Sequence, residues 1–170
     1  MNPNDTNVLL LKLDQLLQER NSAAIEFEAK ESFEMAYLAR WSVVETTVKR
    51  ILYAEAVASL RPKLEEWRKF LDEPSGKSPV PIRHFPVEPS RAKLPTAEDL
   101  KKRYSAAPNL LELLDSKKRF RKRRNSIAHS ADAFGQRTTY EEYKDKVEAA
   151  TGELREALSS AKSICDRIDS

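Results

Sequence analysis

The stretch FEMAYLARWSVVETTVKRIL, residues 33–52, decides the fold class. Its large apolar side chains recur mostly at steps of three and four residues: Phe33, Tyr37, Trp41, Val44, Val48, Ile51 and Leu52. This spacing lines them up along one side of an α-helix, where burial in a core accounts for their size and number. We therefore expect a long amphipathic helix that packs against other helices.

Similar patterns lie on both sides of this stretch. A first helix is expected to start after Asn4 or Asp5, and the second helix to begin near Ser22 and include residues 33–52. Pro62 is expected to kink or interrupt it. A last helix is expected from about Thr138. With only three glycines in 170 residues, these patterns predict an all-α, up-and-down bundle of four or five helices in a single domain, residues 1–170.

A proline-rich segment interrupts the helical pattern. Six of the nine prolines lie between Pro74 and Pro95, so residues 74–95 are expected to form a long surface loop. His84 lies in this loop, where a passive exposed position is favoured over contact with a ligand. Thr96 and Asp99 then have the spacing of a capping box that starts a short helix.

Several classes of protein and site are not indicated by the sequence. No apolar run approaches the roughly 20 residues that span a bilayer, and no signal-peptide pattern opens the chain, so we expect a cytoplasmic protein without a membrane partner. The single cysteine, Cys165, permits no intrachain disulfide and no cysteine-rich metal site. No phosphate-binding glycine loop, nucleophile elbow or zinc-ligand spacing is present, so no cofactor or metal is expected.

The formal net charge of +3 hides an uneven distribution of charge along the chain. Residues 1–60 and residues 130–170 each carry nine acidic and six basic side chains, a balance of −3. Residues 61–129 carry eighteen basic and nine acidic side chains, a balance of +9. Positive charge concentrated in the middle of the chain creates a local field that attracts polyanions.

The densest positive charge lies in KKRFRKRR, residues 117–124, where seven of eight side chains are cationic. Such a run can bind the phosphates of RNA without reading its sequence, although a solvated helix face is the ordinary alternative. The candidate phosphate-binding residues are Lys117, Lys118, Arg121, Lys122 and Arg123. Tyr104, which precedes this run, is a candidate for stacking on a base.

The sequence separates Arg124 from the other cations of the run. A helix that opens at Pro108 is expected to carry through the run, and Arg124 lies four residues after Phe120 and three before Ile127, on its apolar face. An inward-facing arginine needs an anionic partner from the protein or from a ligand. His129, five residues later, is about 140° away around an ideal helix, whereas it shares a face with Asn125. Either the helix frays near His129, or Arg124 and His129 line different walls of one cleft.

Glu45 lies on or beside the apolar stripe of residues 33–52, where an unpaired carboxylate would be costly. Arg124 and His129 are both candidate partners, and a solvated margin of the helix is the alternative. A structural, supporting role for Glu45 is favoured over a catalytic one, because exposed helix margins are common positions for glutamate.

Arg124, Asn125 and His129, late in a helical pattern of an all-helical chain, resemble the signature of the HEPN superfamily (higher eukaryotes and prokaryotes nucleotide-binding domains). In that signature an arginine, often followed by asparagine, precedes a histidine by four to six residues. The resemblance is specific around residues 124–129 and extends in architecture to most of the chain. It implies a homodimer whose two motifs face a shared cleft. The apolar side chains expected along the last helix, at steps of three and four residues from Tyr143 to Ile168, form a seam that also predicts a dimer.

For function, the resemblance implies a metal-independent endoribonuclease that leaves 2′,3′-cyclic phosphate ends, as in toxin–antitoxin or anti-phage defence systems. His129 would act as general base or acid, Arg124 would hold the scissile phosphate, and Asn125 would orient one of them. RNA is then the substrate, and an antitoxin or another regulatory protein is an implied partner.

One position departs from a familiar variant of the family. A tyrosine often stands two positions after the histidine and is modified by a partner nucleotidyltransferase, but here that residue is Ala131. A partner of that kind is therefore in doubt. Two further functions remain open: a non-catalytic module that binds RNA or nucleotides, and an interaction domain in which the arginine and histidine make only structural contacts.

Overall fold

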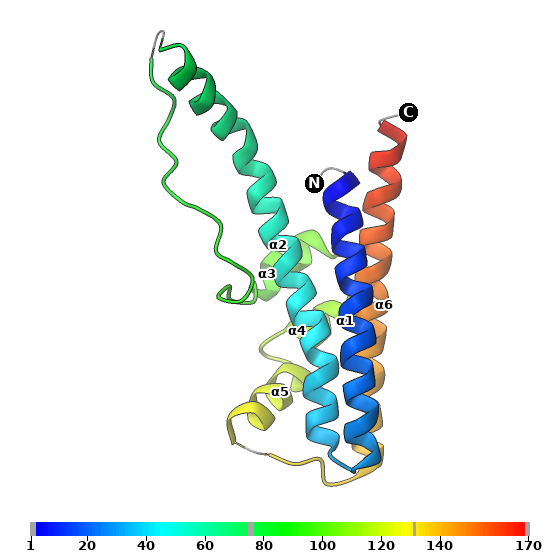
Figure 1. The fold of residues 1–170 in the computed structure, drawn as a ribbon. Coiled ribbons are helices and arrows are strands. Elements are labelled where there is room, and N and C mark those ends of the chain that lie inside the picture. Colours follow the sequence, from blue (N-terminus) through cyan, green and yellow to red (C-terminus); the bar gives the residue numbers. More distant parts are fainter. Residues whose placement is uncertain (1–2, 75–76, 131, 169–170) are drawn as a thin grey trace.

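A computed structural model describes residues 3–74, 77–130 and 132–168. Within these residues the chain is helical and has no strands, which confirms the all-α class (Figure 1). There are six helices in the described part, rather than four or five: α1 (Pro3–Ala29), α2 (Phe33–Asp72), α3 (Ala97–Arg103), α4 (Pro108–Leu114), α5 (Arg119–Ser130) and α6 (Arg137–Ile168).

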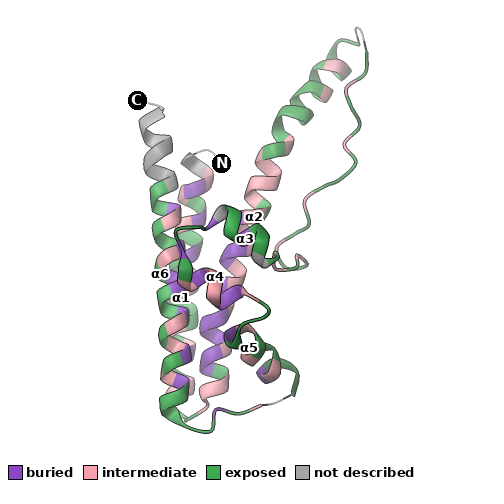
Figure 2. Cartoon of the chain, turned by 180° about the vertical axis from the view of Figure 1, so that it is seen from behind, coloured by how far each residue is buried: buried purple, intermediate pink, exposed green. Residues whose placement is uncertain are grey.

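The core of the protein lies between α1, the first half of α2, and α6. The helices α1 and α2 form an antiparallel hairpin, and α6 runs beside them so that the start of α1 and the end of α6 lie at the same end (Figure 1). Buried residues line the surfaces by which these helices face one another (Figure 2). Tyr37, Trp41, Val44 and Val48 of α2 are all fully buried, as the spacing of residues 33–52 predicted.

The connection between α1 and α2 does not lie where the sequence predicted it. A second helix was expected to begin near Ser22, but α1 continues to Ala29. The alanines and glutamates between these positions favour a helix, so nothing there ends it. The turn forms at residues 30–32 instead, where Glu31 has a left-handed φ of 55° and the amide of Ser32 donates to the carbonyl of Phe27 at 2.8 Å.

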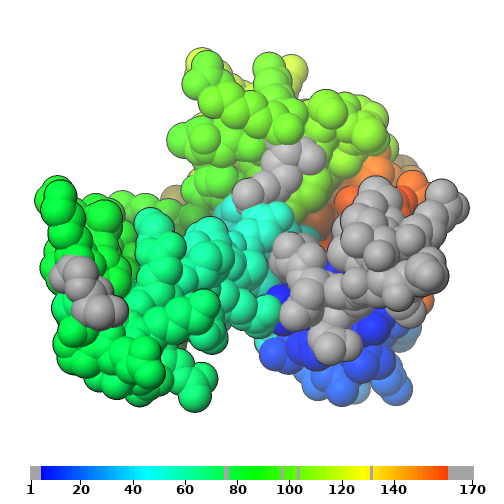
Figure 3. Space-filling view, turned by 90° about the horizontal axis from the view of Figure 1, so that it is seen from above, coloured from blue at the N-terminus to red at the C-terminus, as the bar shows by residue number. Residues whose placement is uncertain are grey.

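The helix α2 continues through Pro62 to Asp72, so the expected interruption does not occur. Pro62 is exposed, and water can bind the carbonyl that lacks an N–H partner because of the proline. The outer half of α2 leaves the bundle and stands apart from α1 and α6 (Figures 1 and 3). Residues 77–95 return beside it without helical structure, as predicted, and Trp67 Nε1 donates to the carbonyl of Val80 at 3.1 Å.

The helix expected to run from Pro108 through the basic run is broken into α4 and α5. Between them the side chain of Asp115 accepts a hydrogen bond from the amide of Lys117 at 2.9 Å, and its carbonyl accepts one from the amide of Lys118 at 3.1 Å. Aspartate favours such local turns over a helix interior, which explains the break. Thr96 and Asp99 form the predicted capping box at the start of α3.

The apolar seam of α6 packs inside the protein. Tyr140, Val147, Ala150 and Leu154 are buried, and the seam remains buried as far as Leu158. These side chains face α1, α2 and α4, so they are not available to a second copy of the chain. This part of the seam therefore gives no support to the expected dimer, and the side chains of the seam after residue 160 lie outside the described residues. None of the helices in the described ranges is both long enough and apolar enough to cross a membrane.

Candidate functional site

The sequence motif lies on α5, which packs beside α2. Phe120 and Ile127 are buried, and the half-buried Arg124 between them reaches across to α2. Its Nη2 atom lies 2.9 Å from Oε2 of Glu45. The inward position of Arg124 is therefore confirmed, and Glu45 is the anionic partner that this position required.

Glu45 is held on three sides. Besides Arg124, it binds Nζ of Lys49 at 2.7 Å through Oε1, and Trp41 Nε1 donates to its Oε2 at 3.2 Å. Burial would raise the pKa of the Glu45 carboxyl. The hydrogen bond from Lys49 and the positive charges of Arg124 and Lys49 outweigh burial and lower this pKa below its ordinary value. Glu45 is therefore ionised at neutral pH and fixes the guanidinium of Arg124 in place.

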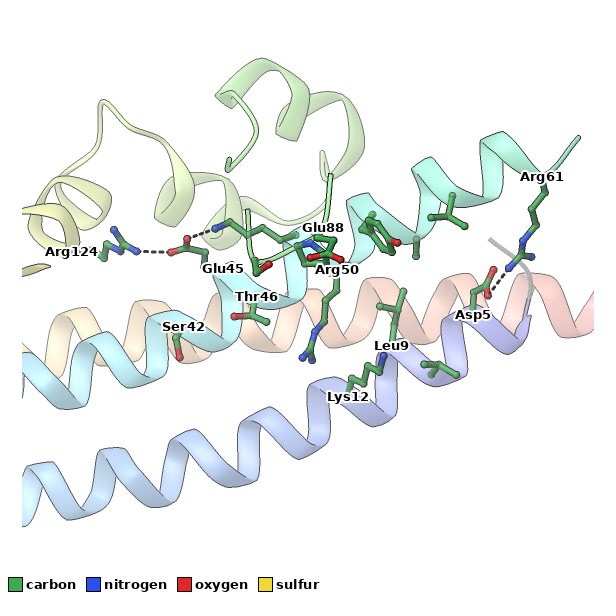
Figure 4. Close-up of a pocket in the computed structure, with 17 residues that line it drawn as sticks. Asp5, Leu9, Lys12, Ser42, Glu45, Thr46, Arg50, Arg61, Glu88 and Arg124 are labelled. Atoms are coloured by element: carbon green, nitrogen blue, oxygen red, sulfur yellow. Dashed lines mark hydrogen bonds and ion pairs between the residues drawn. The ribbon is translucent and has the colours of Figure 1, made fainter. Parts of the chain in front are cut away.

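Asn125 holds the other end of this guanidinium. Nη1 of Arg124 donates to Oδ1 of Asn125 at 3.2 Å. A guanidinium has five N–H donors, so two such contacts do not exhaust it. Arg124 also lines two neighbouring cavities of about 920 and 370 Å³, the larger of which is drawn in Figure 4. The arrangement presents a fixed cation, with donors remaining, at the edge of space large enough for an anion.

His129 lies apart from Arg124. It is exposed in the last turn of α5, and within the described part of the chain no hydrogen bond or ion pair joins it to Arg124 or to any other residue. Lys122, Asn125 and His129, spaced by three and four residues, share an exposed face of the helix. The structure therefore brings Asn125 and His129 to one face, and Asn125 connects that face to Arg124.

The lysines of the basic run differ from its arginines. Lys117, Lys118 and Lys122 are exposed, and their side chains make no ion pair with other residues that the structure describes. They remain available to phosphates. Because exposed lysines on a helix surface also occur without any ligand, their position is compatible with RNA binding and does not by itself identify it.

Three arginines of the run are used to attach α5 to the rest of the protein. Arg119 forms an ion pair with Glu142 on α6. Arg121 Nη1 donates to the carbonyl of Leu114 at 2.8 Å. Arg123 binds Oδ2 of Asp132 at 2.6 Å, and its guanidinium lies 4.6 Å from the ring centroid of Phe134. Two candidate phosphate ligands, Arg121 and Arg123, therefore already have protein partners.

The positions of two other residues bear on the sequence predictions. Tyr104 is buried, so its ring is not available to stack on a base as expected. His84 is exposed in residues 77–95, which we call the return segment. Its side chain has no hydrogen-bond partner among the described residues, in agreement with a passive position. Ala131 lies outside the described residues.

The sequence did not point to several residues that line the cavities. Lys12 of α1 and Arg50 of α2 line the larger cavity, and Lys93 of the return segment lines the smaller one. These residues come from separate segments, so no local spacing could have identified them. Lys49 was more accessible to prediction, because it lies one helical turn after Glu45.

Two further findings concern the identity of the site. Within the described residues, no three His, Cys, Asp or Glu side chains come together in a group that could hold a metal ion. Comparison with protein-family models, with curated proteins and with solved structures gives no match for this chain. The interpretation of the site therefore depends on its own geometry and on the motif at residues 124–129.

Proposed function

We propose that the chain is an RNA-binding endoribonuclease of the HEPN type. The observation that carries this proposal is the environment of Arg124: the contacts with Glu45 and Asn125 fix its guanidinium beside two cavities, on the same helix as the exposed His129. A fixed cation that has donors left for a phosphate and a histidine that is open to solvent are two of the groups needed for RNA cleavage.

The chemistry uses the neighbouring 2′-hydroxyl of the RNA as the nucleophile. One imidazole nitrogen of His129 takes the proton of this hydroxyl, the 2′-oxygen bonds to phosphorus, and the bond to the 5′-oxygen breaks. The leaving 5′-oxygen takes a proton from water or from a second imidazolium. Arg124 binds the non-bridging oxygens as charge builds on them. The products end in a 2′,3′-cyclic phosphate and a 5′-hydroxyl.

A homodimer is part of this proposal. The positions of Arg124 and His129 differ by about 140° around α5, and no contact joins their side chains in the described part of the chain, so we propose that a second protomer completes the site. Two copies related by a twofold axis, with the exposed faces of their α5 helices opposed, would place two histidines beside one RNA strand. Lys117, Lys118 and Lys122 would then supply positive charge from both sides.

A second candidate function is an RNA- or nucleotide-binding module that does not cut. It is favoured by a specific observation: Arg124 already forms an ion pair with Glu45, and His129 makes no contact with it. In this alternative the exposed lysines bind phosphates, and Arg124 serves mainly to join α5 to α2.

The test measures cleavage of total RNA and of a defined oligoribonucleotide by the wild type and by His129→Ala. His84→Ala is the matched control, because it removes the other exposed histidine of the chain. We expect His129→Ala to cut about 10²–10⁴-fold more slowly while still binding RNA, and His84→Ala to cut normally. Cleavage should persist in EDTA, and a 2′-deoxyribose at the cut should block it.

The other outcomes separate the alternatives. Wild-type protein that binds RNA at low salt but leaves every RNA intact would support the binding module. A wild type that fails to bind RNA at low salt would favour an interaction domain with only structural contacts at the motif. Equal cleavage by His129→Ala and the wild type would remove His129 from the mechanism.

A further inference from the structure

A groove separates the start of α1 from the middle of α2. It forms the larger cavity, of about 920 Å³, with residues 88–90 of the return segment on its rim. Figure 4 shows Arg124 at one end and, at the other, the ion pair of Arg61 with Asp5 at 3.2 Å. Beyond this pair the outer half of α2 continues away from the bundle (Figure 3). The groove therefore opens onto one side of a projecting helix.

Apolar side chains follow the groove and extend beyond it. Val8 of α1 and Tyr53 of α2 line it and are 47% and 36% exposed, and the half-buried Val57 of α2 lines it as well. Leu64 and Leu71 follow Val57 at intervals of seven residues and are 48% and 69% exposed. Residues seven apart lie on one side of a helix and form the contacts by which one helix packs along another. The groove and the outer half of α2 therefore form one exposed apolar strip.

Positive charge borders this strip. Lys12 and Arg50 extend into the groove from opposite walls (Figure 4), and within the described residues neither has a hydrogen-bond or ion-pair partner. Arg68, one turn beyond Leu64, is exposed and likewise has none in the described part. The groove is lined by five cationic and three acidic side chains. Two of the acidic side chains, Asp5 and Glu45, already form ion pairs with arginines. The groove thus has a surplus of positive charge that favours an anionic occupant.

We propose that this groove binds an acidic amphipathic helix of another protein. The seven-residue spacing of the apolar strip fits a helix laid along α2. From Val57 to Leu71 the strip spans fourteen residues, or about 21 Å, which is roughly four turns. Glutamate or aspartate on the borders of the bound helix would meet Lys12, Arg50 and Arg68. We name this surface the α1–α2 groove.

Two other occupants fit these observations less well. A second copy of the chain that offered the outer half of its own α2 would bring a segment with no surplus of acid, because residues 61–73 carry four basic and four acidic side chains. Such a segment complements the cations of the groove less well than an acidic helix does. RNA would satisfy the positive charge. It would leave Leu64 and Leu71 exposed, because phosphates and sugars do not cover an aliphatic strip. The combined apolar and cationic character favours the acidic helix.

The test uses the full-length protein and a fluorescent eighteen-residue peptide, with leucines at seven-residue and alternating three- and four-residue spacing and glutamates beside them. A scrambled peptide of the same composition is the first control. We expect the ordered peptide to bind at least tenfold more tightly than the scrambled one, measured by fluorescence anisotropy. Equal binding of both peptides would show that charge alone attracts them and would overturn the proposal.

Variants then locate the binding site. Leu64→Glu and the pair Lys12→Glu with Arg50→Glu should each weaken binding at least tenfold, whereas Arg20→Glu, an exposed charge reversal elsewhere on α1, should not. Circular dichroism confirms that each variant is folded. Unchanged binding by all the groove variants would contradict the proposal. So would a wild-type affinity for single-stranded RNA that Leu64→Glu lowers as much as it lowers peptide binding, or a wild-type dimer mass that Leu64→Glu halves, because these results assign the apolar strip to RNA or to a second copy.

Discussion

Two arginine–glutamate pairs of the protein have the same length and different surroundings. Arg40 of α2 lies 2.9 Å from Glu28 of α1, and Arg124 of α5 lies 2.9 Å from Glu45 of α2. The side chain of Arg40 is 7% exposed, whereas that of Arg124 is 28% exposed. The first pair joins helices inside the bundle, and the second lies beside two cavities.

The two arginines have the same number of terminal nitrogens bound, and they differ in what surrounds those bonds. Nη1 of Arg40 reaches Asn21 at 3.0 Å and Nη2 reaches Glu28, as Nη1 of Arg124 reaches the exposed Asn125 and Nη2 reaches Glu45. Glu28 also accepts a hydrogen bond from Tyr140, which fastens α6 to the same point. The contact that serves folding is therefore buried and surrounded by protein. The pair of Arg124 with Glu45, which is proposed to serve RNA binding, leaves the arginine side chain partly exposed to solvent. The length of the ion pair is therefore the same for a contact that stabilises the fold and for one proposed to bind RNA.

The largest effect is expected on RNA cleavage, when the pair of Arg124 with Glu45 is removed. Arg124→Ala should reduce RNA cleavage by about 10²–10⁴-fold, because it removes the group proposed to stabilise charge on the phosphate. The free energy of unfolding should change by less than about 1 kcal/mol, since the pair is partly solvated. Single-turnover cleavage and urea unfolding measure the two quantities. Severe destabilisation would mean that this pair resembles the buried one.

The next largest effect is expected on the stability of the protein, when the buried pair of Arg40 with Glu28 is removed. Arg40→Met keeps much of the side-chain volume but leaves Glu28 without its main cation, so the free energy of unfolding should fall by about 3 kcal/mol. Arg137→Met is the control, because Arg137 and Glu141 form an exposed pair at 3.5 Å and should contribute less than about 0.5 kcal/mol. Equal urea midpoints for the two variants would abolish the distinction between buried and exposed pairs.

The salt dependence of RNA affinity would distinguish the exposed lysines of the basic run from the arginines that already have protein partners. If the three lysines and Arg124 each contact one phosphate of single-stranded RNA, log K against log salt should have a slope near −3, at about −0.7 per contact. Replacing Lys118 and Lys122 by alanine should flatten the slope by roughly 1.4. A slope near zero for the wild type would exclude these lysines from RNA binding.

The smallest effect is expected in the stability of the protein at acidic pH, to which Glu28 and Glu45 should contribute in the same way. Burial would raise the pKa values of Glu28 and Glu45, but hydrogen bonds and neighbouring positive charges outweigh it and lower both below the ordinary 4.5. A lowered carboxyl pKa stabilises the folded state above the unfolded pKa, and this stability is lost as pH falls through the folded value. Unfolding free energy should therefore decrease below about pH 4.5, and less steeply in Glu28→Gln and Glu45→Gln. Denaturant titrations from pH 3 to 6 provide the check, and parallel curves for all three proteins would contradict it.

Features that depend on helical periodicity were predictable from the sequence. The burial of Tyr37 and Trp41 and the inward position of Arg124 follow from side chains three and four residues apart, which share a face of any helix. For Glu45 the sequence left Arg124, His129 and a solvated helix margin as alternatives, because an unpaired carboxylate beside a core is costly. The roles proposed for Asn125 and His129 remain predictions from the motif.

Features that depend on contacts between distant segments were not predictable. The presence of Lys12 and Arg50 in the lining of one cavity depends on the angle at which α2 leaves α1, and no local pattern encodes that angle. Tyr104 was a candidate for stacking on a base, yet it packs into the core. The break at Asp115 was also missed, because the apolar spacing continues across it from Leu114 to Phe120 even though the backbone does not.

The outer half of α2 has a consequence for hydrogen exchange. All 40 residues of α2 belong to one helix, about 60 Å long, but only the part from Ala36 to Ile51 contributes buried side chains. Amide protons in that part should exchange only when the whole protein unfolds, whereas those near Leu71 should exchange through local fraying. Protection should therefore decline steadily along a single helix. A partner bound to the α1–α2 groove would reveal itself by slowing exchange at the outer end alone.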